Sequence, residues 1–254
     1  MRVALIQSDL VWEGKQSNLT NFRDKIRGLK GKADLIVLPE MFSTGFTMNP
    51  SNVAEPMSGE TVRWMIQMAK EANAALCGSV VTEESGSFRN RCLFVKPSGE
   101  VVYYDKRHLF TLAGEHQTYC RGNEKVVVTY KDFRICLQVC YDLRFPAFSR
   151  YNDDYDMLIY VANWPEPRIG AWDALLRARA IENMCYVAGV NRIGEDPNGN
   201  KYPGHSQVFD VFGNSVVETS AAEAIFITDV NVEDLREARK RFNFLEDRDQ
   251  FTVN

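Results

Sequence analysis

The amino-acid sequence predicts an α/β protein in which two β-sheets pack face to face and helices cover the outside. About twelve short apolar runs, rich in Val, Ile, Leu and aromatic residues, have the lengths of β-strands. Three longer stretches with helical periodicity alternate with these runs along the chain. So many strands with so few long helices do not fit one sheet covered by helices. We therefore expect two sheets packed against each other.

The predicted strands extend over most of the chain. In order, they are RVALIQ, DLIVLP, AALCGSVV, RCLFVKP, EVVYYD, VVVTY, FRICLQVC, DMLIYVAN, CYVAGVNR, SQVFDV, NSVVET and AIFITDV. Turn residues inside VKPSGEVV and DVFGNSVV indicate that the runs on either side form hairpins.

Helical periodicity is clear in three stretches. The first has an apolar stripe at Leu19, Phe22, Ile26 and Leu29, and the second has one at Val62, Met65, Ile66, Ala69 and Ala72. In the third, from Ala171 to Asn183, apolar residues alternate with charged ones in a partly helical rhythm.

We expect residues 1–254 to form a single domain, because no repeat, low-complexity tract or linker divides the sequence. Within it, residues 231–254 are expected to form a C-terminal helix and tail. The tail is charged but contains the apolar residues Phe242, Phe244, Leu245 and Phe251. Such side chains have little reason to stay in solvent, so we expect the tail to pack on the body or on a partner subunit.

Composition and charge argue against several kinds of partner. The chain has 30 Lys and Arg against 34 Asp and Glu, a net charge of −4, and no basic block. A nucleic-acid or anionic-membrane partner is therefore not expected. The apolar start of the chain is only about five residues long, too short for a signal peptide, and no run approaches the roughly 20 residues of a membrane span. We expect a cytoplasmic protein.

The six cysteines do not predict a metal site or a disulfide. They are scattered, no C-x-x-C pair occurs, and the chain has only three histidines, so no zinc or other metal is expected. Cys136 and Cys140 lie on one predicted strand, where four residues span about 13 Å. That exceeds the roughly 7 Å limit between the Cα atoms of bridged cysteines.

Chemistry-bearing residues follow three of the predicted strands. Glu40 follows LIVLP, Cys140 ends LQVC, and Trp164 follows IYVAN. Ligands bind beyond the carboxyl ends of strands in open α/β sheets, so these residues would share one pocket if their strands were neighbours. Taken singly, they read as a turn carboxylate, a packed core thiol and a core aromatic. Lys106 and Glu115 likewise read as a surface lysine and an exposed loop acid.

Taken together and in order, the segments LPEMFSTGF, YDKRHLF and CYDLRFP resemble the signatures of the nitrilase (carbon–nitrogen hydrolase) superfamily. ANWPEPR, ARAIENMCYVAGVNR and GHSQVFDVFGN are similar to further segments of that family. The resemblance implies a four-layer α-β-β-α sandwich, a homodimer, and a reaction that needs no metal or organic cofactor.

The resemblance also assigns catalytic roles. Cys140 would attack the substrate carbon, and Glu40 would be its base, since a thiol with a pKa near 8.5 is mostly protonated at pH 7. Lys106, together with the backbone N–H of Tyr141, would stabilise the oxyanion, and its charge would favour thiolate over thiol. Glu115 would orient the lysine or the attacking water.

CYDLRFP is most similar to the omega-amidase branch, which implies a small amide substrate of the 2-oxoglutaramate or 2-oxosuccinamate type, hydrolysed to an acid and ammonia. The far carboxylate of such a substrate needs a cation, and arginine offers a two-pronged donor. Arg168 is the first candidate and Arg144 the second, although Asp142 could simply pair with Arg144. Phe46 and Trp164 would form apolar walls of the pocket.

Two alternatives stay open. The first is a carbamoyl-amine or general aliphatic amidase of the same superfamily. The second is a redox-sensing or binding protein in which Cys140 is a sensor or structural thiol. The presence of Glu40, Lys106 and Glu115 in order argues against the second.

Overall fold

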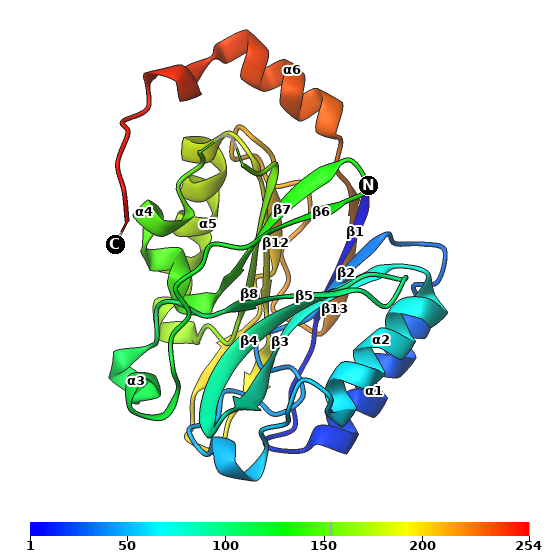
Figure 1. Ribbon diagram of the computed structural model, residues 1–254. Helices are drawn as coiled ribbons and strands as arrows, with labels where there is room; N and C mark the ends of the chain where they lie inside the picture. The colour runs from blue at the N-terminus through cyan, green and yellow to red at the C-terminus, as the bar shows by residue number, and fades with distance from the viewer. Residues whose placement is uncertain (153, 254) are drawn as a thin grey trace.

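The computed structural model describes residues 1–152 and 154–253. Two β-sheets lie face to face in its centre (Figure 1). The first sheet has the order β13 (Ala224–Asp229), β1 (Arg2–Gln7), β2 (Leu35–Val37), β3 (Ala75–Glu84), β4 (Ser87–Val95), β5 (Val101–Asp105). The second has the order β12 (Gln207–Phe209), β9 (Tyr186–Asn191), β8 (Met157–Ala162), β7 (Phe133–Val139), β6 (Val127–Tyr130). A separate hairpin joins β10 (Ile193–Glu195) to β11 (Lys201–Pro203).

Helices form the two outer layers (Figure 1). The helices α1 (Lys15–Arg27) and α2 (Glu60–Ala72) cover the first sheet, and α5 (Ile169–Asn183) covers the second. The short helices α3 (Glu115–Thr118) and α4 (Pro146–Ser149) lie in connecting segments, and α6 (Val232–Phe242) follows the last strand. Short 3₁₀ turns are η1 (Pro50–Asn52), η2 (Thr111–Ala113), η3 (Cys140–Arg144), η4 (Glu166–Arg168) and η5 (Phe244–Asp247). The expected four-layer α-β-β-α sandwich is confirmed.

The central strands are buried on both faces, because the other sheet covers one face and helices cover the other. In β1, Val3 and Leu5 point into the layer between the sheets, and Ala4 and Ile6 pack against the α1–α2 layer. Successive side chains of a strand point to opposite faces, so both sets are buried. This explains why the sequences of the central strands are continuous apolar runs, whereas β13, at the edge of the first sheet, partly buries only alternate residues.

The helices and strands predicted from the sequence agree with the structure at all but two places. The three predicted helices are present, and β4 and β5 form the predicted hairpin. The predicted strand NSVVET is wrong: beyond the turn, only Phe209 and Ser215 form a bridge. Asp210 closes that turn with its carboxylate, and the chain then leaves the sheet. The β10–β11 hairpin was not predicted, because its Gly-, Asn- and Pro-rich sequence resembles a loop.

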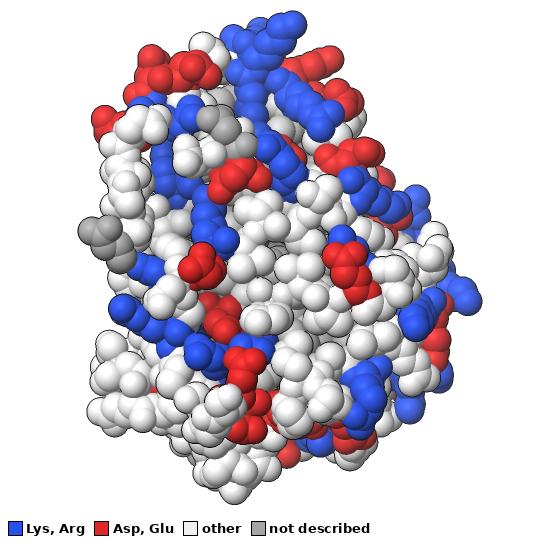
Figure 2. Space-filling model, in the orientation of Figure 1, with Lys and Arg blue, Asp and Glu red and all other residues white. Residues whose placement is uncertain are grey.

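The C-terminal segment begins with a charged helix. Val232, Leu235 and Ala238 of α6 pack into the core, while its outer face carries acidic and basic side chains next to one another (Figure 2). After α6, Leu245 is buried under the second sheet's helix layer, but Phe251 is exposed. Within the described residues, no helix is long and apolar enough to cross a membrane.

Candidate active site

The catalytic candidates come from both sheets. Cys140 follows β7 and Trp164 follows β8, and these two strands are parallel neighbours, as the strand-end argument requires. Glu40 follows β2, which belongs to the other sheet, so the condition that all three strands are neighbours is met only for the strands before Cys140 and Trp164. The two sheets instead face each other at their carboxyl ends. There, the backbone N–H of Asn163 donates to Glu40 Oε2 at 2.9 Å.

Three buried charges form the centre of the site. Lys106, just after β5, places its Nζ 2.9 Å from Glu40 Oε1 and 2.9 and 3.0 Å from the two carboxylate oxygens of Glu115. Burial by itself lowers the pKa of Lys106, but the charges of Glu115 and Glu40 outweigh this and raise the pKa above its ordinary value. The lysine therefore stays charged.

Glu115 is not an exposed loop acid. It is fully buried at the start of α3 and accepts a hydrogen bond from the backbone N–H of Phe110 at 2.6 Å. Burial raises its pKa, Lys106 lowers it, and the charge of Glu40 raises it again, so the pKa lies above its usual value. Glu115, which the sequence motifs proposed as a catalytic residue, therefore lies in one cluster with Lys106 and Glu40.

Cys140 occupies a strained turn. Its φ is +45°, in the left-handed region that non-glycine residues avoid, and it begins η3 directly after β7. Such conformations cost about 1–3 kcal/mol and persist where the surroundings hold them. The Sγ atom lies 4.0 Å from the carbonyl oxygen of Asn163.

The Cys140 thiol is protonated at rest. Burial and the negative charge of Glu40 raise its pKa well above the ordinary value, and Lys106 only partly opposes them. The expected effect of the lysine is present, since the charge of Lys106 lowers the pKa of the Cys140 thiol, but burial and Glu40 outweigh it. Deprotonation has to accompany the attack on a substrate, which requires a base next to the sulfur.

Two asparagines that the sequence did not single out hold Glu40. The Asn90 side-chain amide on β4 donates to Glu40 Oε1 at 2.8 Å and to Glu115 Oε1 at 3.2 Å. Asn163 donates its side-chain amide to the backbone carbonyl of Glu40 at 2.7 Å. Asn90 lies between two arginines just before the predicted strand RCLFVKP, and Asn163 is the last residue of the predicted strand DMLIYVAN. No local pattern distinguished either asparagine from an ordinary polar residue at the end of a strand.

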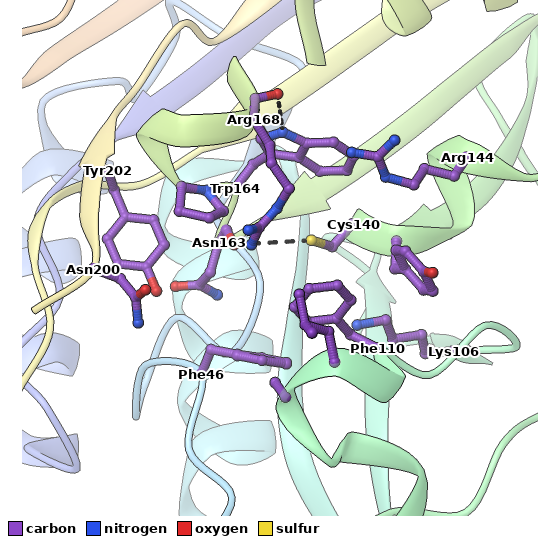
Figure 3. Close-up of a pocket in the computed structure, with 14 residues that line it drawn as sticks. Phe46, Lys106, Phe110, Cys140, Arg144, Asn163, Trp164, Arg168, Asn200 and Tyr202 are labelled. Atoms are coloured by element: carbon purple, nitrogen blue, oxygen red, sulfur yellow. Dashed lines mark hydrogen bonds between the residues drawn. The ribbon is translucent and has the colours of Figure 1, made fainter. Parts of the chain in front are cut away.

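A cavity of about 210 Å³ opens onto Cys140 (Figure 3). Its walls include the predicted residues Phe46, Lys106, Tyr141, Arg144, Trp164 and Arg168. Its walls also include residues that were not predicted, among them Phe110, Asn200 and Tyr202. Asn200 and Tyr202 come from the β10–β11 hairpin and its turn, so the hairpin that was not predicted supplies one part of the pocket wall.

Both predicted arginines face this cavity. The Arg144 guanidinium lies 5.0 Å from the ring centre of Trp164, and that of Arg168 lies 5.1 Å from the ring centre of Phe110. Neither forms an ion pair within residues 1–152 and 154–253. The alternative that Arg144 pairs with Asp142 is wrong, because the Asp142 carboxylate is occupied by other donors.

This fold, with a Cys–Glu–Lys centre at the carboxyl ends of two facing sheets, defines a carbon–nitrogen hydrolase. The chain belongs to that family, whose model matches residues 2–240. It is 46% identical to the omega-amidase YafV of Escherichia coli K12, over 100% of this chain and 98% of the relative. It is 29% identical to the 2-oxoglutaramate amidase of Bacillus subtilis, over 96% of both chains.

A solved structure agrees with these relatives. The carbon–nitrogen hydrolase superfamily protein XC1258 from Xanthomonas campestris, which has an arsenic adduct in its active site, superimposes with a TM-score of 0.97. It is 40% identical and covers 100% of this chain, with 99% of its own chain aligned. The family expected from the sequence motifs is confirmed.

Proposed function

We propose that the protein is an amidase that hydrolyses the terminal amide of a small carboxylate-bearing substrate, of the 2-oxoglutaramate or 2-oxosuccinamate type, to the acid and ammonia. The observation that carries the proposal is the buried Lys106 ammonium held between Glu40 and Glu115 beside the Cys140 thiol. Two similar proteins, an omega-amidase and a 2-oxoglutaramate amidase, support the same chemistry.

In the first half-reaction, the Cys140 sulfur attacks the amide carbon while Glu40 takes the thiol proton. Lys106 and the backbone N–H of Tyr141 stabilise the negative charge that develops on the amide oxygen. Glu40 then gives the proton to the leaving nitrogen. The C–N bond breaks, ammonia leaves, and a thioester to Cys140 remains.

In the second half-reaction, water attacks the thioester carbon. Glu40 accepts a proton from this water, the C–S bond breaks, and the sulfur regains a proton as the acid leaves. Glu115 contacts Lys106 with both carboxylate oxygens, which holds the ammonium in place through both steps. The Asn90 amide bridges the two glutamates and keeps the base next to the lysine.

The positions of Arg144 and Arg168 support the proposal that the substrate carries a carboxylate. Both guanidiniums line the cavity without an acidic partner among the described residues, and an aromatic wall lies under each. Charged groups in such a wall bind an anion strongly because the apolar rings displace water. A 2-oxo acid offers them a carboxylate and a neighbouring carbonyl oxygen. An α-ammonium group, as in glutamine, would place a third positive charge beside the two guanidiniums.

An ammonia-release screen tests the proposal. The substrates are 2-oxoglutaramate, 2-oxosuccinamate, glutamine, asparagine and a carbamoyl amine, with carbon dioxide measured in parallel. We expect the two 2-oxo amides to give the highest kcat/KM and the Cys140→Ser variant to be folded but inactive. Release of carbon dioxide from the carbamoyl amine at a higher kcat/KM would favour the alternative amidase. Ammonia release by C140S at the wild-type rate would refute the assignment of the nucleophile.

We further infer that the protein forms a homodimer through an apolar patch composed of Ile181, Phe212, Phe242 and Phe244. These side chains are 50%, 50%, 37% and 62% exposed in the single chain. Phe242 contacts the rings of both Phe212 and Phe244, at centroid distances of 5.4 and 5.5 Å. Contiguous exposed aromatic side chains are typical of an interface, and a second copy would remove them from water.

A further inference from the structure

Asp142 is a buried carboxylate beside the nucleophile that the proposed reaction does not use. It is fully buried and accepts four hydrogen bonds. Oδ2 accepts from the backbone N–H of Val139 at 2.9 Å and from the Tyr104 hydroxyl at 2.8 Å. Oδ1 accepts from the backbone N–H of His108 at 2.9 Å and lies 2.8 Å from His108 Nδ1. The tautomer of His108 with its proton on Nδ1 makes this fourth contact a hydrogen bond to the carboxylate.

The donors belong to the two segments that carry the catalytic thiol and ammonium. Val139 immediately precedes the nucleophile. Tyr104 and His108 stand two residues before and two residues after Lys106. Asp142 therefore connects the end of β7, in the second sheet, to the end of β5 and the loop after it, in the first sheet. Burial and the charge of Asp142 raise the pKa of Tyr104, so its hydroxyl remains a donor.

The other contacts between these two segments are mainly aromatic. The rings of Phe110 and Tyr141 meet edge to face at 5.0 Å, and the His108 ring stacks on Phe145 at 4.0 Å. Ring contacts of this kind tolerate small sliding movements, whereas a set of short hydrogen bonds does not. The left-handed turn at Cys140 also needs surroundings that hold it. The Asp142 carboxylate therefore fixes the position of the Cys140 turn relative to the Lys106 loop, which the ring contacts alone would allow to shift.

We propose that Asp142 is a positioning residue that holds the Cys140 turn and the Lys106 loop in register, so that sulfur and ammonium face the same carbonyl group. It acts through its four hydrogen bonds and does not touch the substrate. This inference rests on the proposed function for its catalytic consequence. The geometry of the thiol can be tested without it.

Asp142→Asn is the main variant. The amide nitrogen of Asn must face either the N–H of Val139 or that of His108, so a backbone donor loses its acceptor in either orientation. A misplacement of about 1 Å costs about 100-fold in rate, so we expect kcat to fall about 100-fold while KM changes less than about threefold. Tyr104→Phe removes one donor only. We expect it to lower kcat several-fold in the wild type and by a smaller factor in D142N, because both substitutions weaken the same set of hydrogen bonds.

The alkylation rate of Cys140 by iodoacetamide gives a readout that needs no amide turnover. We expect it to be about tenfold slower in D142N. If the wild type released no ammonia from any amide in the screen, the function proposal would fail. Slower alkylation of D142N would still support the positioning role. Should D142N not fold, Y104F carries the test, and wild-type kcat and alkylation in Y104F would overturn the inference.

Asp156→Asn is the matched control. Asp156 is also a buried carboxylate, but it binds Arg134 and Arg239 before the start of β8, at the end of the sheet away from the site. We expect D156N to lower the melting temperature and to leave kcat and Cys140 alkylation unchanged. The positioning role is refuted if D142N keeps the wild-type kcat and alkylation rate. It is also refuted if D156N lowers kcat and the Cys140 alkylation rate as much as D142N does.

Discussion

At the level of single residues, the main feature of the site is a group of buried charged side chains that depend on one another. Two carboxylates and one ammonium are buried together, and the fully buried Lys106 forms an ion pair with both glutamates. Removing one partner from such a group leaves an uncompensated charge, which costs more than the pair contributes. The side-chain amide of Asn90 supplies the extra donors for both carboxylates. The charge arrangement is therefore one unit and not three independent residues.

The arginines can be separated from one another by substrate charge. We expect Arg168→Met and Arg144→Met to raise KM for 2-oxoglutaramate by about 10- to 100-fold, since a charge-assisted hydrogen bond contributes about 1.5–3 kcal/mol. KM for a neutral amide such as butyramide should change little. Steady-state kinetics with 2-oxoglutaramate and with butyramide measure the two KM values.

Arg177→Met is the control for this pair, because Arg177 also lies over an aromatic ring, that of Phe209, but does not line the cavity. It should leave both KM values unchanged. An equal rise of KM for the acidic and the neutral amide would remove that arginine from the carboxylate site.

At the scale of elements, α5 lies so close to β9 that the strand needs a glycine there. A Cβ at Gly189 would come 2.5 Å from Leu176 Cδ1 and 2.8 Å from Trp172 Cζ2. Both side chains are fully buried, and Trp172 contacts Trp164 of the cavity wall at a ring distance of 5.5 Å. The helix–strand contact therefore also sets the position of one wall of the active site.

Gly189→Ala should lower the free energy of unfolding by about 1–3 kcal/mol, because overpacking forces the helix or its side chains to move. Urea denaturation measures it. Gly170→Ala, in the first turn of the same helix, meets nothing within 4 Å and is the control. It should be neutral or stabilising by up to about 1 kcal/mol, since Ala favours helix. Equal stability of G189A and the wild type would contradict the close contact.

At the scale of the whole molecule, buried thiols make stability depend on alkaline pH. Burial raises the pKa of Cys136 to about 12. An unfolded thiol with a pKa near 8.5 loses its proton as pH rises, while the folded one keeps it. The native state then binds more protons than the unfolded state, so its stability falls above about pH 8.5.

We expect Cys136 alone to contribute about 2 kcal/mol to the fall in unfolding free energy between pH 8 and pH 10. Cys136→Ala should show a correspondingly smaller fall, measured by urea denaturation at both values. If the wild type and the variant lost the same free energy over this range, the raised pKa of Cys136 would be contradicted.

The quaternary structure is a second property of the whole molecule. Sedimentation at micromolar concentration should give a dimer for the wild type and a monomer for Phe244→Asp, which places a charge in the apolar patch. Val11→Asp changes an equally apolar residue outside the patch, 54% exposed, and should stay a dimer. A monomeric wild type would count against the homodimer.

The sequence by itself determined the family, the layered fold and the four catalytic candidates. Apolar runs and helical stripes report burial directly, and the motifs around Glu40, Lys106 and Cys140 are contiguous in the chain. Only the tertiary structure decided that Glu40 comes from the opposite sheet and that burial and the charge of Glu40 raise the pKa of the Cys140 thiol. It also placed Asn90 and the β10–β11 hairpin at the site. Distances between sheets and the desolvation of a charge depend on how distant segments pack, and no local pattern of residues encodes them.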